Sequence, residues 1–311
     1  MERENATFLE GFILLGLFPG YGHPRTLMSI ILLVYLIAIA ANAILILLIW
    51  VDPRLHTPMY FLLSQLSFID LAYVSSTVPK MATDFFSGSR TISRVGCGTQ
   101  MFFWLMLADA ECILLTLMAY DRYVAVCNPL RYSAVVSPRV CLQMALGSWA
   151  GGMLNALAQT VYTMHFPTCE NKIKHFFCEM PAVLMLSCED TSSYLMVLMG
   201  MSIMFITVPL SLIVASYARI FLAVLRMSSP EGRNKALATC SSHLTVVSLY
   251  LGPAIVVYMT PGSAHSPELD QGLSVFYTVL TPMLNPLIYS LRNKEVLGAL
   301  RKVLGSSWAV K

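Results

Sequence analysis

Charged side chains are scarce in this 311-residue sequence, where Asp, Glu, Lys and Arg together make up only 12%. Soluble domains carry about a quarter, and 57% of the residues here are hydrophobic, so a soluble domain is excluded. The mean hydropathy of +0.68 agrees. A net charge of +3 is too small to indicate a nucleic-acid partner. These values predict an integral membrane protein.

Motifs of catalytic and transport proteins are missing as well. The sequence has no His-Glu-x-x-His zinc motif, no Gly-x-Ser-x-Gly elbow and no phosphate-binding glycine loop, and its six histidines are scattered. No internal repeat relates its two halves, which disfavours a transporter. We therefore expect neither an enzyme nor a cofactor. No signal peptide precedes the first apolar segment, which we expect to direct its own insertion.

Seven apolar segments are long enough to cross about 30 Å of hydrocarbon as helices. An open sheet would leave its edge groups without partners in lipid, and the two-residue alternation of a barrel is absent. We predict one all-α domain over 1–311, a seven-transmembrane helix bundle. Its spans are Leu27–Trp50, Pro58–Pro79, Val95–Tyr120, Val140–Met164, Ser192–Ala218, Ala236–Thr260 and Gln271–Leu291.

The basic residues orient these spans. With the N-terminal segment 1–26 outside, thirteen of the twenty Lys and Arg residues fall on the inner side, as the positive-inside rule requires. A glycosylation sequon at Asn5 agrees, because such a site is used only outside. The tail 292–311 would then be cytoplasmic, and its apolar residues at helical spacing predict a short amphipathic helix on the inner membrane surface.

The cysteines divide in the same way. Cys97, Cys169, Cys178 and Cys188 fall outside, where disulfides form, and four cysteines allow three connectivities. Three of them lie in the loop 165–191, so at least one bridge ties this loop to itself or to the third span. A loop of this length is rarely a mere linker, and we interpret it as a lid.

Three acids lie within the predicted spans, at Asp70, Asp109 and Glu111. Such acids are costly and mark functional sites by default, although a hydrogen-bonded structural acid is an alternative. At 1.5 Å per residue, Asp70, Glu111 and Asn42 lie at similar depths, with Asn285 somewhat lower. Two carboxylates there would repel unless one is protonated or a cation lies between them. We predict a polar layer, able to bind sodium, that rearranges during switching.

The third span ends in Met118-Ala-Tyr-Asp-Arg-Tyr-Val-Ala-Val-Cys127. On its own, Arg122 reads as an ordinary anchor charge at the membrane boundary. Helical geometry places Trp104, Ala108, Glu111, Leu115 and Arg122 on one stripe, with Asp109 about 140° away. The outer half of this stripe either lines a pocket or packs between helices. Pro209, Pro253 and Pro286 lie inside the last three spans as hinges or static kinks.

Five motifs in register resemble the odorant receptors of the land-vertebrate type, a branch of the rhodopsin-like G-protein-coupled receptors. They are Leu55-His-Thr-Pro-Met-Tyr60, Met118–Cys127, Ser216-Tyr217, Lys235-Ala-Leu-Ala-Thr-Cys-Ser-Ser-His243 and Pro282-Met-Leu-Asn-Pro-Leu-Ile-Tyr-Ser-Leu-Arg-Asn293. Any one alone is weak, whereas together they are specific and span nearly the whole chain.

The resemblance implies a plasma-membrane receptor with an extracellular N-terminus that binds a small volatile odorant. It implies coupling to a heterotrimeric stimulatory G protein that raises cyclic AMP, with membrane lipid as the surrounding partner. It pairs Cys97 with Cys178 and Cys169 with Cys188. Its switch residues correspond to Asp121, Arg122, Tyr123, Tyr217, His243, Asn285, Pro286 and Tyr289. Its odorant pocket corresponds to Trp104, Leu105, Ala108, Asp109, Cys112, Met201, Ser202, Phe205, Leu251, Ala254, Ile255, Tyr258 and Thr278.

Two residues depart from the family pattern. Leu251 stands where the family usually has a tyrosine, and the nearby aromatic residue is Tyr250. Asp109 stands where a small or hydroxyl residue is typical. If ionised, Asp109 favours an amine; if protonated, it donates to an alcohol or carbonyl, and an otherwise apolar pocket favours the neutral form. A receptor for amine hormones is the second candidate, but Trp104 occupies the place of its amine-binding acid.

Overall fold

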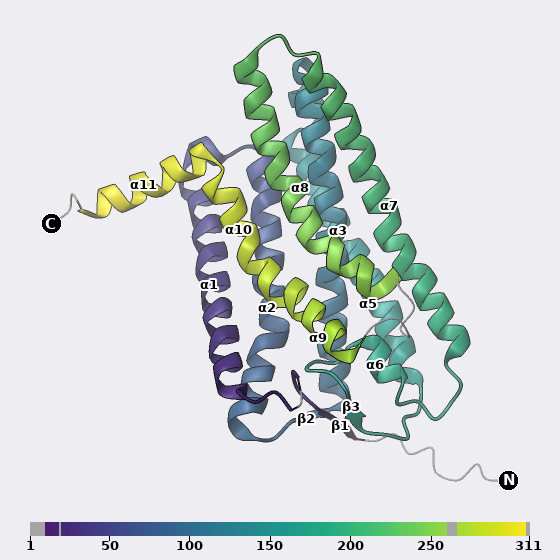
Figure 1. Cartoon of the computed structure of the whole chain (residues 1–311). Helices are drawn as coiled ribbons and strands as arrows, with labels where there is room; N and C mark the ends of the chain where they lie inside the picture. The colour runs from purple at the N-terminus through teal and green to yellow at the C-terminus, as the bar shows by residue number, and fades with distance from the viewer. Residues whose placement is uncertain (1–9, 19, 260–265, 309–311) are drawn as a thin grey trace.

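The chain folds into a bundle of long helices in a computed structural model (Figure 1). The structure describes residues 10–18, 20–259 and 266–308, without the side chains at 202, 235, 267 and 304–308. The sequon at Asn5 and the side chain of Ser202 therefore lie outside the described part. The long helices are α1 (Pro24–Val51), α2 (Pro58–Ser87), α3 (Arg94–Cys127), α5 (Pro138–His165), α7 (Ser192–Leu225) and α8 (Pro230–Met259).

Several helices run beyond the apolar segments that predicted them. Helix α2 continues past Pro79 to Ser87, and α3 continues past Tyr120 to Cys127. Hydropathy marks only the part of a helix in hydrocarbon, whereas polar pairs carry α2 further. Lys80 forms an ion pair with Asp84 one turn later, and Lys80 Nζ also donates to the Thr91 carbonyl at 3.0 Å. The apolar pattern therefore located the helices but underestimated their length.

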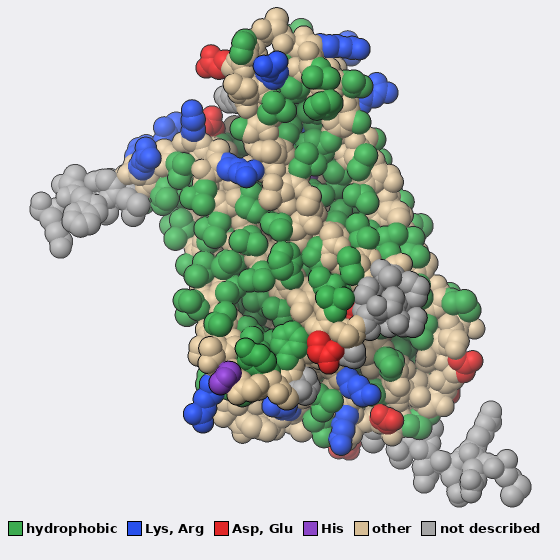
Figure 2. Space-filling model, in the orientation of Figure 1, with side chains coloured by type: hydrophobic (Ala, Val, Ile, Leu, Met, Phe, Trp, Pro, Cys, Tyr) green, Lys and Arg blue, Asp and Glu red, His purple; other side chains and the backbone are tan. Residues whose placement is uncertain are grey.

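Within the described residues, five helices are individually long and apolar enough to cross a membrane: α1, α2, α3, α7 and α8. Helix α5 is interrupted by small and polar residues, and the seventh segment is divided into shorter helices. The space-filling view shows hydrophobic side chains over the middle of the molecule, with Lys and Arg near its two ends (Figure 2). This distribution suits a bundle surrounded by lipid.

The seventh segment is not a uniform helix. It consists of α9 (Pro267–Val275), the π-helical turn η4 (Phe276–Leu280) and α10 (Thr281–Leu291). Thr281 Oγ1 donates to the Phe276 carbonyl at 3.2 Å and to the Leu249 carbonyl of α8 at 3.4 Å. A π-helical turn widens the helix locally and is frequent at functional sites. The irregularity thus precedes Pro282 rather than Pro286, which lies inside α10.

The outer end of the bundle carries a small sheet that the sequence did not reveal. Strand β1 (Gly11–Leu14) pairs antiparallel with β2 (Thr91–Ser93) and parallel with β3 (Lys172–Ile173). The apolar residues preceding the first span therefore join the lid to the α2–α3 connection. Disulfides Cys97–Cys178 and Cys169–Cys188 fix the same lid, which also holds the short helix α6 (Met180–Leu184). The lid is thus attached to α3 by one disulfide, closed on itself by the other, and paired with β1 through β3.

The inner end holds the shorter elements η1 (Pro53–Leu55), η2 (Pro129–Arg131), α4 (Tyr132–Val135) and α11 (Lys294–Trp308). Helix α11 leaves the bundle at a steep angle to α1 (Figure 1). Its Val296 and Ala299 are buried, while Lys294, Arg301 and Lys302 are exposed. This two-sided pattern is that of a helix lying on a membrane surface.

Helix α3 lies at the centre of the bundle, in contact with α2, α5, α7 and α8. Its Leu107, Leu114 and Leu115 are almost completely buried. Because lipid tails are as apolar as leucine, van der Waals packing of such side chains, and not removal from water, holds α3 against its neighbours. A relative movement of α2, α5, α7 or α8 at the centre of the bundle would therefore change the contacts that α3 makes.

Candidate functional site

An outer cavity of about 90 Å³ lies beneath the lid, between α3, α5, α6, α7 and α8. It is walled mainly by apolar and aromatic side chains with a few polar groups, the usual composition of a small-molecule site. The lining residues are Trp104, Leu105, Ala108, Asp109, Cys112, Asn155, Gln159, Glu179, Met180, Pro181, Phe205, Ile206, Tyr250, Leu251, Ala254 and Tyr258.

Hydrogen bonds hold the polar walls of this cavity in place. The Asn155 amide donates to Asp109 Oδ2 at 2.7 Å, which joins α5 to α3. The Tyr250 hydroxyl donates to the Ala108 carbonyl at 2.7 Å, which joins α8 to α3. The Tyr258 hydroxyl donates to Glu179 Oε1 at 3.1 Å, which joins α8 to the lid. The cavity is therefore built from fixed groups on three helices and the lid.

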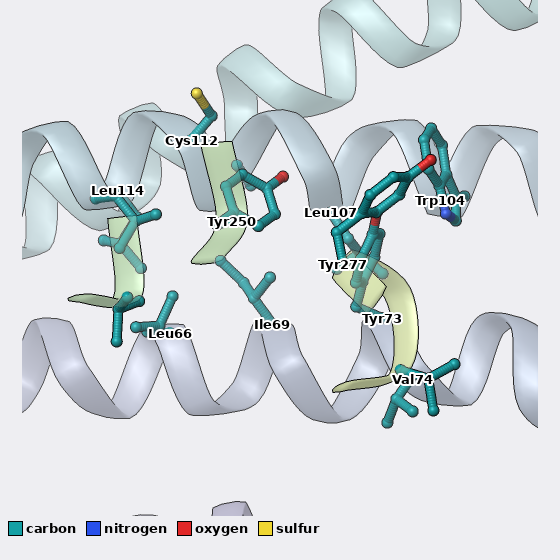
Figure 3. Packing of buried hydrophobic residues seen from close by; sticks show 14 of the residues in the cluster. Leu66, Ile69, Tyr73, Val74, Trp104, Leu107, Cys112, Leu114, Tyr250 and Tyr277 are labelled. Atoms are coloured by element: carbon teal, nitrogen blue, oxygen red, sulfur yellow. The ribbon is translucent and has the colours of Figure 1, made fainter. Parts of the chain in front are cut away.

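Three aromatic rings pack around Trp104, which lines the cavity. Its ring lies 5.2 Å from that of Phe177 in the lid, 5.9 Å from Tyr73 of α2 and 6.1 Å from Tyr277 of η4. Figure 3 shows Trp104 beside Tyr277, with Tyr250 near Cys112 further along α3. These contacts connect the cavity wall to the π-helical turn of the seventh segment.

A buried polar layer lies below the cavity. The Asn285 amide donates to both oxygens of Asp70, at 3.1 and 3.2 Å, and reaches Glu111 Oε1 at 3.5 Å. The Asn42 amide instead donates to the Pro282 carbonyl at 2.8 Å. The four side chains are at most 1% exposed. The structure therefore brings Asp70, Glu111 and Asn285 together, with Asn285 between the two carboxylates, while Asn42 joins α1 to α10 at Pro282.

A second, inner cavity of about 810 Å³ opens at the end of the bundle from which α11 leaves. Its walls include Asp121 and Arg122 of α3, His243 of α8, and Tyr289 of α10. Arg122 Nε donates to Asp121 Oδ2 at 2.9 Å, and the Tyr132 hydroxyl donates to Asp121 Oδ1 at 2.7 Å. The carboxylate thus holds the guanidinium on one side and the start of α4 on the other.

Two further predicted switch residues meet beside this cavity. The Tyr217 hydroxyl lies 2.7 Å from His243 Nδ1, and the two rings stack with centroids 5.7 Å apart. Helices α7 and α8 are thereby joined near Arg122. Tyr123 contacts Tyr120, with ring centroids 6.2 Å apart. The hydroxyl of Tyr289 and the Nε2 atom of His243 are buried and form no hydrogen bond with the described residues.

Comparison with known proteins decides the family. A family model described as "Olfactory receptor" matches residues 31–307. The chain is 53% identical to Olfactory receptor 2T27 of Homo sapiens over 306 residues, covering 98% of this chain and 96% of the relative. The chain belongs to the olfactory receptor family. It is also 53% identical to Olfactory receptor 2L2 of Homo sapiens over 312 residues, with both chains fully covered.

The receptor is therefore a multi-pass plasma-membrane protein with the seven-helix fold of its family, and it is not an enzyme. Of the thirteen residues that the resemblance places in its pocket, nine line the outer cavity. Met201, Ile255 and Thr278 do not line it, and the Ser202 side chain is not described. Thr278 instead lies fully buried in the π-helical turn.

Sequence reasoning missed the polar wall of this receptor's cavity. Asn155 and Gln159 lie four residues apart on α5 and so share one face. That spacing in a span without charges was the available signal. Glu179 follows Cys178, and the bridge to Cys97 places it over the cavity. The expectation for Asp109 assumed that the rest of the pocket is apolar, and the presence of Asn155, Gln159 and Glu179 shows that it is not.

The lid of the receptor contains a buried pair, His175 and Glu179, whose Nε2 and Oε2 atoms lie 3.4 Å apart. Burial raises the pKa of Glu179 to about 7. The hydrogen bond from Tyr258 opposes this rise, and the negative charge of Asp270 adds to it. Burial lowers the pKa of His175 to about 3. The imidazole is therefore uncharged at neutral pH, and the close contact is not an ion pair.

Proposed function

We propose that this olfactory receptor binds a small volatile molecule in the outer cavity and then activates a stimulatory G protein that raises cyclic AMP. One observation carries the proposal: α3 lines both cavities. Trp104 is at the outer cavity and Arg122 at the inner one, eighteen residues or about 27 Å apart along the helix. A ligand that displaces the outer part of α3 relative to α8 also acts on the Arg122 end.

The inner cavity suits the G protein as partner. In the state described by the structure, Asp121 neutralises Arg122, while the Tyr217 hydroxyl is hydrogen-bonded to His243 on α8. An outward movement of α8 would separate this second pair and expose Arg122 to the G protein. Tyr289 of α10 lines the same cavity, Pro286 precedes it on that helix, and α11 would rest on the inner membrane surface.

The polar layer supports a role in switching. The buried oxygens Asn42 Oδ1, Glu111 Oε2 and Asn285 Oδ1 form no hydrogen bond with the described residues. Carboxylate and amide oxygens are suitable ligands for a hard cation, so these donors fit a sodium ion. Asp70 and Glu111 would hold that ion, which would neutralise the repulsion between them. Asn285 would orient the two carboxylates through its amide.

A cyclic AMP screen tests the proposal. Cells expressing the receptor are exposed to a broad panel of volatile molecules, with surface expression measured in parallel. Arg122→Ala should abolish the response while leaving surface expression intact. Arg139→Ala is the matched control, because Arg139 is an exposed residue of the inner end that does not line the inner cavity. If the receptor reached the cell surface and none of the volatile molecules raised cyclic AMP, the result would contradict the proposal.

A further inference from the structure

Two carboxyl groups line the outer cavity, and the described lining residues include no basic side chain to compensate them. Asp109 enters from α3 and Glu179 from the lid, and none of the described residues that line the cavity is Lys, Arg or His. The nearest imidazole in the lid, His175, contacts Glu179 but does not line the cavity. Acids in an enclosed cavity with low-dielectric walls produce a negative potential there, which favours a cation and repels an anion.

Asp109 is the better placed of the two acids to pair with a ligand. Its Oδ2 atom is oriented by Asn155 at 2.7 Å, and the side chain is only half-buried, so it presents surface to the cavity. Both oxygens of Glu179 already have neighbours, Tyr258 at 3.1 Å and His175 at 3.4 Å. The oxygens of Glu179 are therefore less free to accept from a ligand, while Asp109 offers an acceptor in a fixed direction.

Size and the aromatic walls restrict the cation further. The cavity measures about 90 Å³, and a cavity of about 150 Å³ is large enough for benzene. A ligand with fewer than the six non-hydrogen atoms of benzene therefore fits these walls without displacing them. The rings of Trp104, Phe205 and Tyr250 line the same space, and aromatic faces attract ammonium groups.

We propose that agonists of this receptor are small organic cations, namely primary or secondary amines with a short apolar group, whose ammonium group pairs with Asp109. The inference rests on the proposed function, because it names the ligand class of the same cavity. An alkyl ammonium group is charged at neutral pH, as the lysine pKa of about 10.4 shows. It supplies hydrogen-bond donors to Asp109, neutralises the cavity and leaves its alkyl group against the apolar walls.

The test compares matched ligands of equal size. Isobutylamine, isobutanol and isobutyric acid share one carbon skeleton, as do cyclobutylamine and cyclobutanol with a four-membered ring. Each is applied to cells expressing the full receptor, and cyclic AMP is measured at neutral pH. We expect the amines to activate at lower concentration than the alcohols, and the acid to be inactive. An alcohol as potent as its matched amine would overturn the proposal.

Variants of the three acids test which one pairs with the ammonium group. Asp109→Asn should weaken the potency of the amines by roughly 30-fold or more, the effect of removing one partner of a desolvated charge pair, with little effect on any response to alcohols. Glu179→Gln should weaken the amines less. Glu170→Gln, an exposed acid of the same lid, should leave them unchanged. Unaltered amine potency in Asp109→Asn with normal surface expression would overturn the assignment.

A binding measurement separates this inference from the proposed function. Thermal unfolding of the purified receptor in detergent detects stabilisation by isobutylamine without any G protein. Stabilisation that requires Asp109 but produces no cyclic AMP would support the ligand class and contradict the signalling route. Activation by neutral volatile molecules, with neither stabilisation nor activation by amines, would contradict the ligand class and support the signalling route.

Discussion

The side-chain amide of Asn285 donates to both carboxylate oxygens of Asp70, at 3.1 and 3.2 Å, where both side chains are buried. The same amide reaches Glu111 Oε1 at 3.5 Å. One neutral group on α10 thus connects the acids of α2 and α3. Both acids were visible in the sequence as costly intramembrane residues, but only the fold shows which group bridges them.

Asn285→Leu keeps the size of the side chain and removes this bridge. We expect the receptor to lose about 2 kcal/mol of stability, because a buried acid deprived of a hydrogen bond bears the full desolvation penalty. Thermal unfolding in detergent measures the loss. Adding Asp70→Asn to the variant should recover part of it, since one of the two acids is then gone. Equal unfolding temperatures for Asn285→Leu and the wild type would show that the bridge contributes nothing.

The lid acid Glu179 predicts a pH dependence. Its pKa in the folded receptor is raised to about 7 from an ordinary value of 4.5. Between these values the folded state keeps a proton that the unfolded state loses, so the contribution of Glu179 to stability falls as pH rises from 4.5 to 7 and is constant above. The total is on the order of 3 kcal/mol. Glu179→Gln should remove this dependence.

The measurement is the difference in unfolding temperature between Glu179→Gln and the wild type at several pH values. His175 acts in the opposite sense: its pKa is lowered to about 3, so its contribution is lost as pH falls from 6.5 toward 3. It is present in both proteins and cancels in the difference. The advantage of Glu179→Gln should therefore grow from pH 5 to about pH 7 and then level off. A difference that does not change with pH would contradict the raised pKa.

The positions of the helices could be predicted from the sequence, because lipid imposes a length and a composition on each span. Helical depth alone predicted that Asp70 and Glu111 lie at a similar level, but not that Asn285 bridges them. The small outer sheet could not, because Gly11–Leu14 pairs with Thr91–Ser93 and Lys172–Ile173, which are far away in the sequence. The place of Glu179 depends on a disulfide partner that spacing alone does not identify. The π-helical turn at 276–280 has no clear signal in the sequence.

The two disulfides should differ in what their removal does. Cys97–Cys178 closes a sequence separation of 81 residues and Cys169–Cys188 one of 19. The chain-entropy relation gives contributions of about 4.5 and about 3 kcal/mol. Replacing both cysteines of a bridge by serine should therefore reduce surface expression more for the first pair. The first bridge also positions Glu179, so any surviving receptor should respond to agonist less well than one lacking only the second bridge. The reverse order in both measurements would contradict this.

A single backbone contact sets the distance between α3 and α5. A Cβ atom at Gly152 would lie 2.4 Å from the Met106 carbonyl oxygen and 3.0 Å from the Ala110 nitrogen, which are main-chain atoms one turn apart on α3. A rigid helix cannot yield as a flexible side chain does. At Gly147, earlier on the same helix, an added Cβ meets nothing within 4 Å. Close packing against α3 therefore requires glycine at position 152 but not at position 147.

The same substitution should have opposite effects at these two positions. Gly147→Ala should be neutral or stabilise the receptor by up to about 1 kcal/mol, because alanine favours a helix over glycine. Gly152→Ala should destabilise it by roughly 1–3 kcal/mol, the usual range for overpacking. It should also weaken agonist response, because α5 cannot separate from α3 without lengthening the 2.7 Å bond between Asn155 and Asp109. Thermal unfolding and cyclic AMP measurements on both variants check this, and equal tolerance of the two substitutions would mean that the helices can shift apart freely.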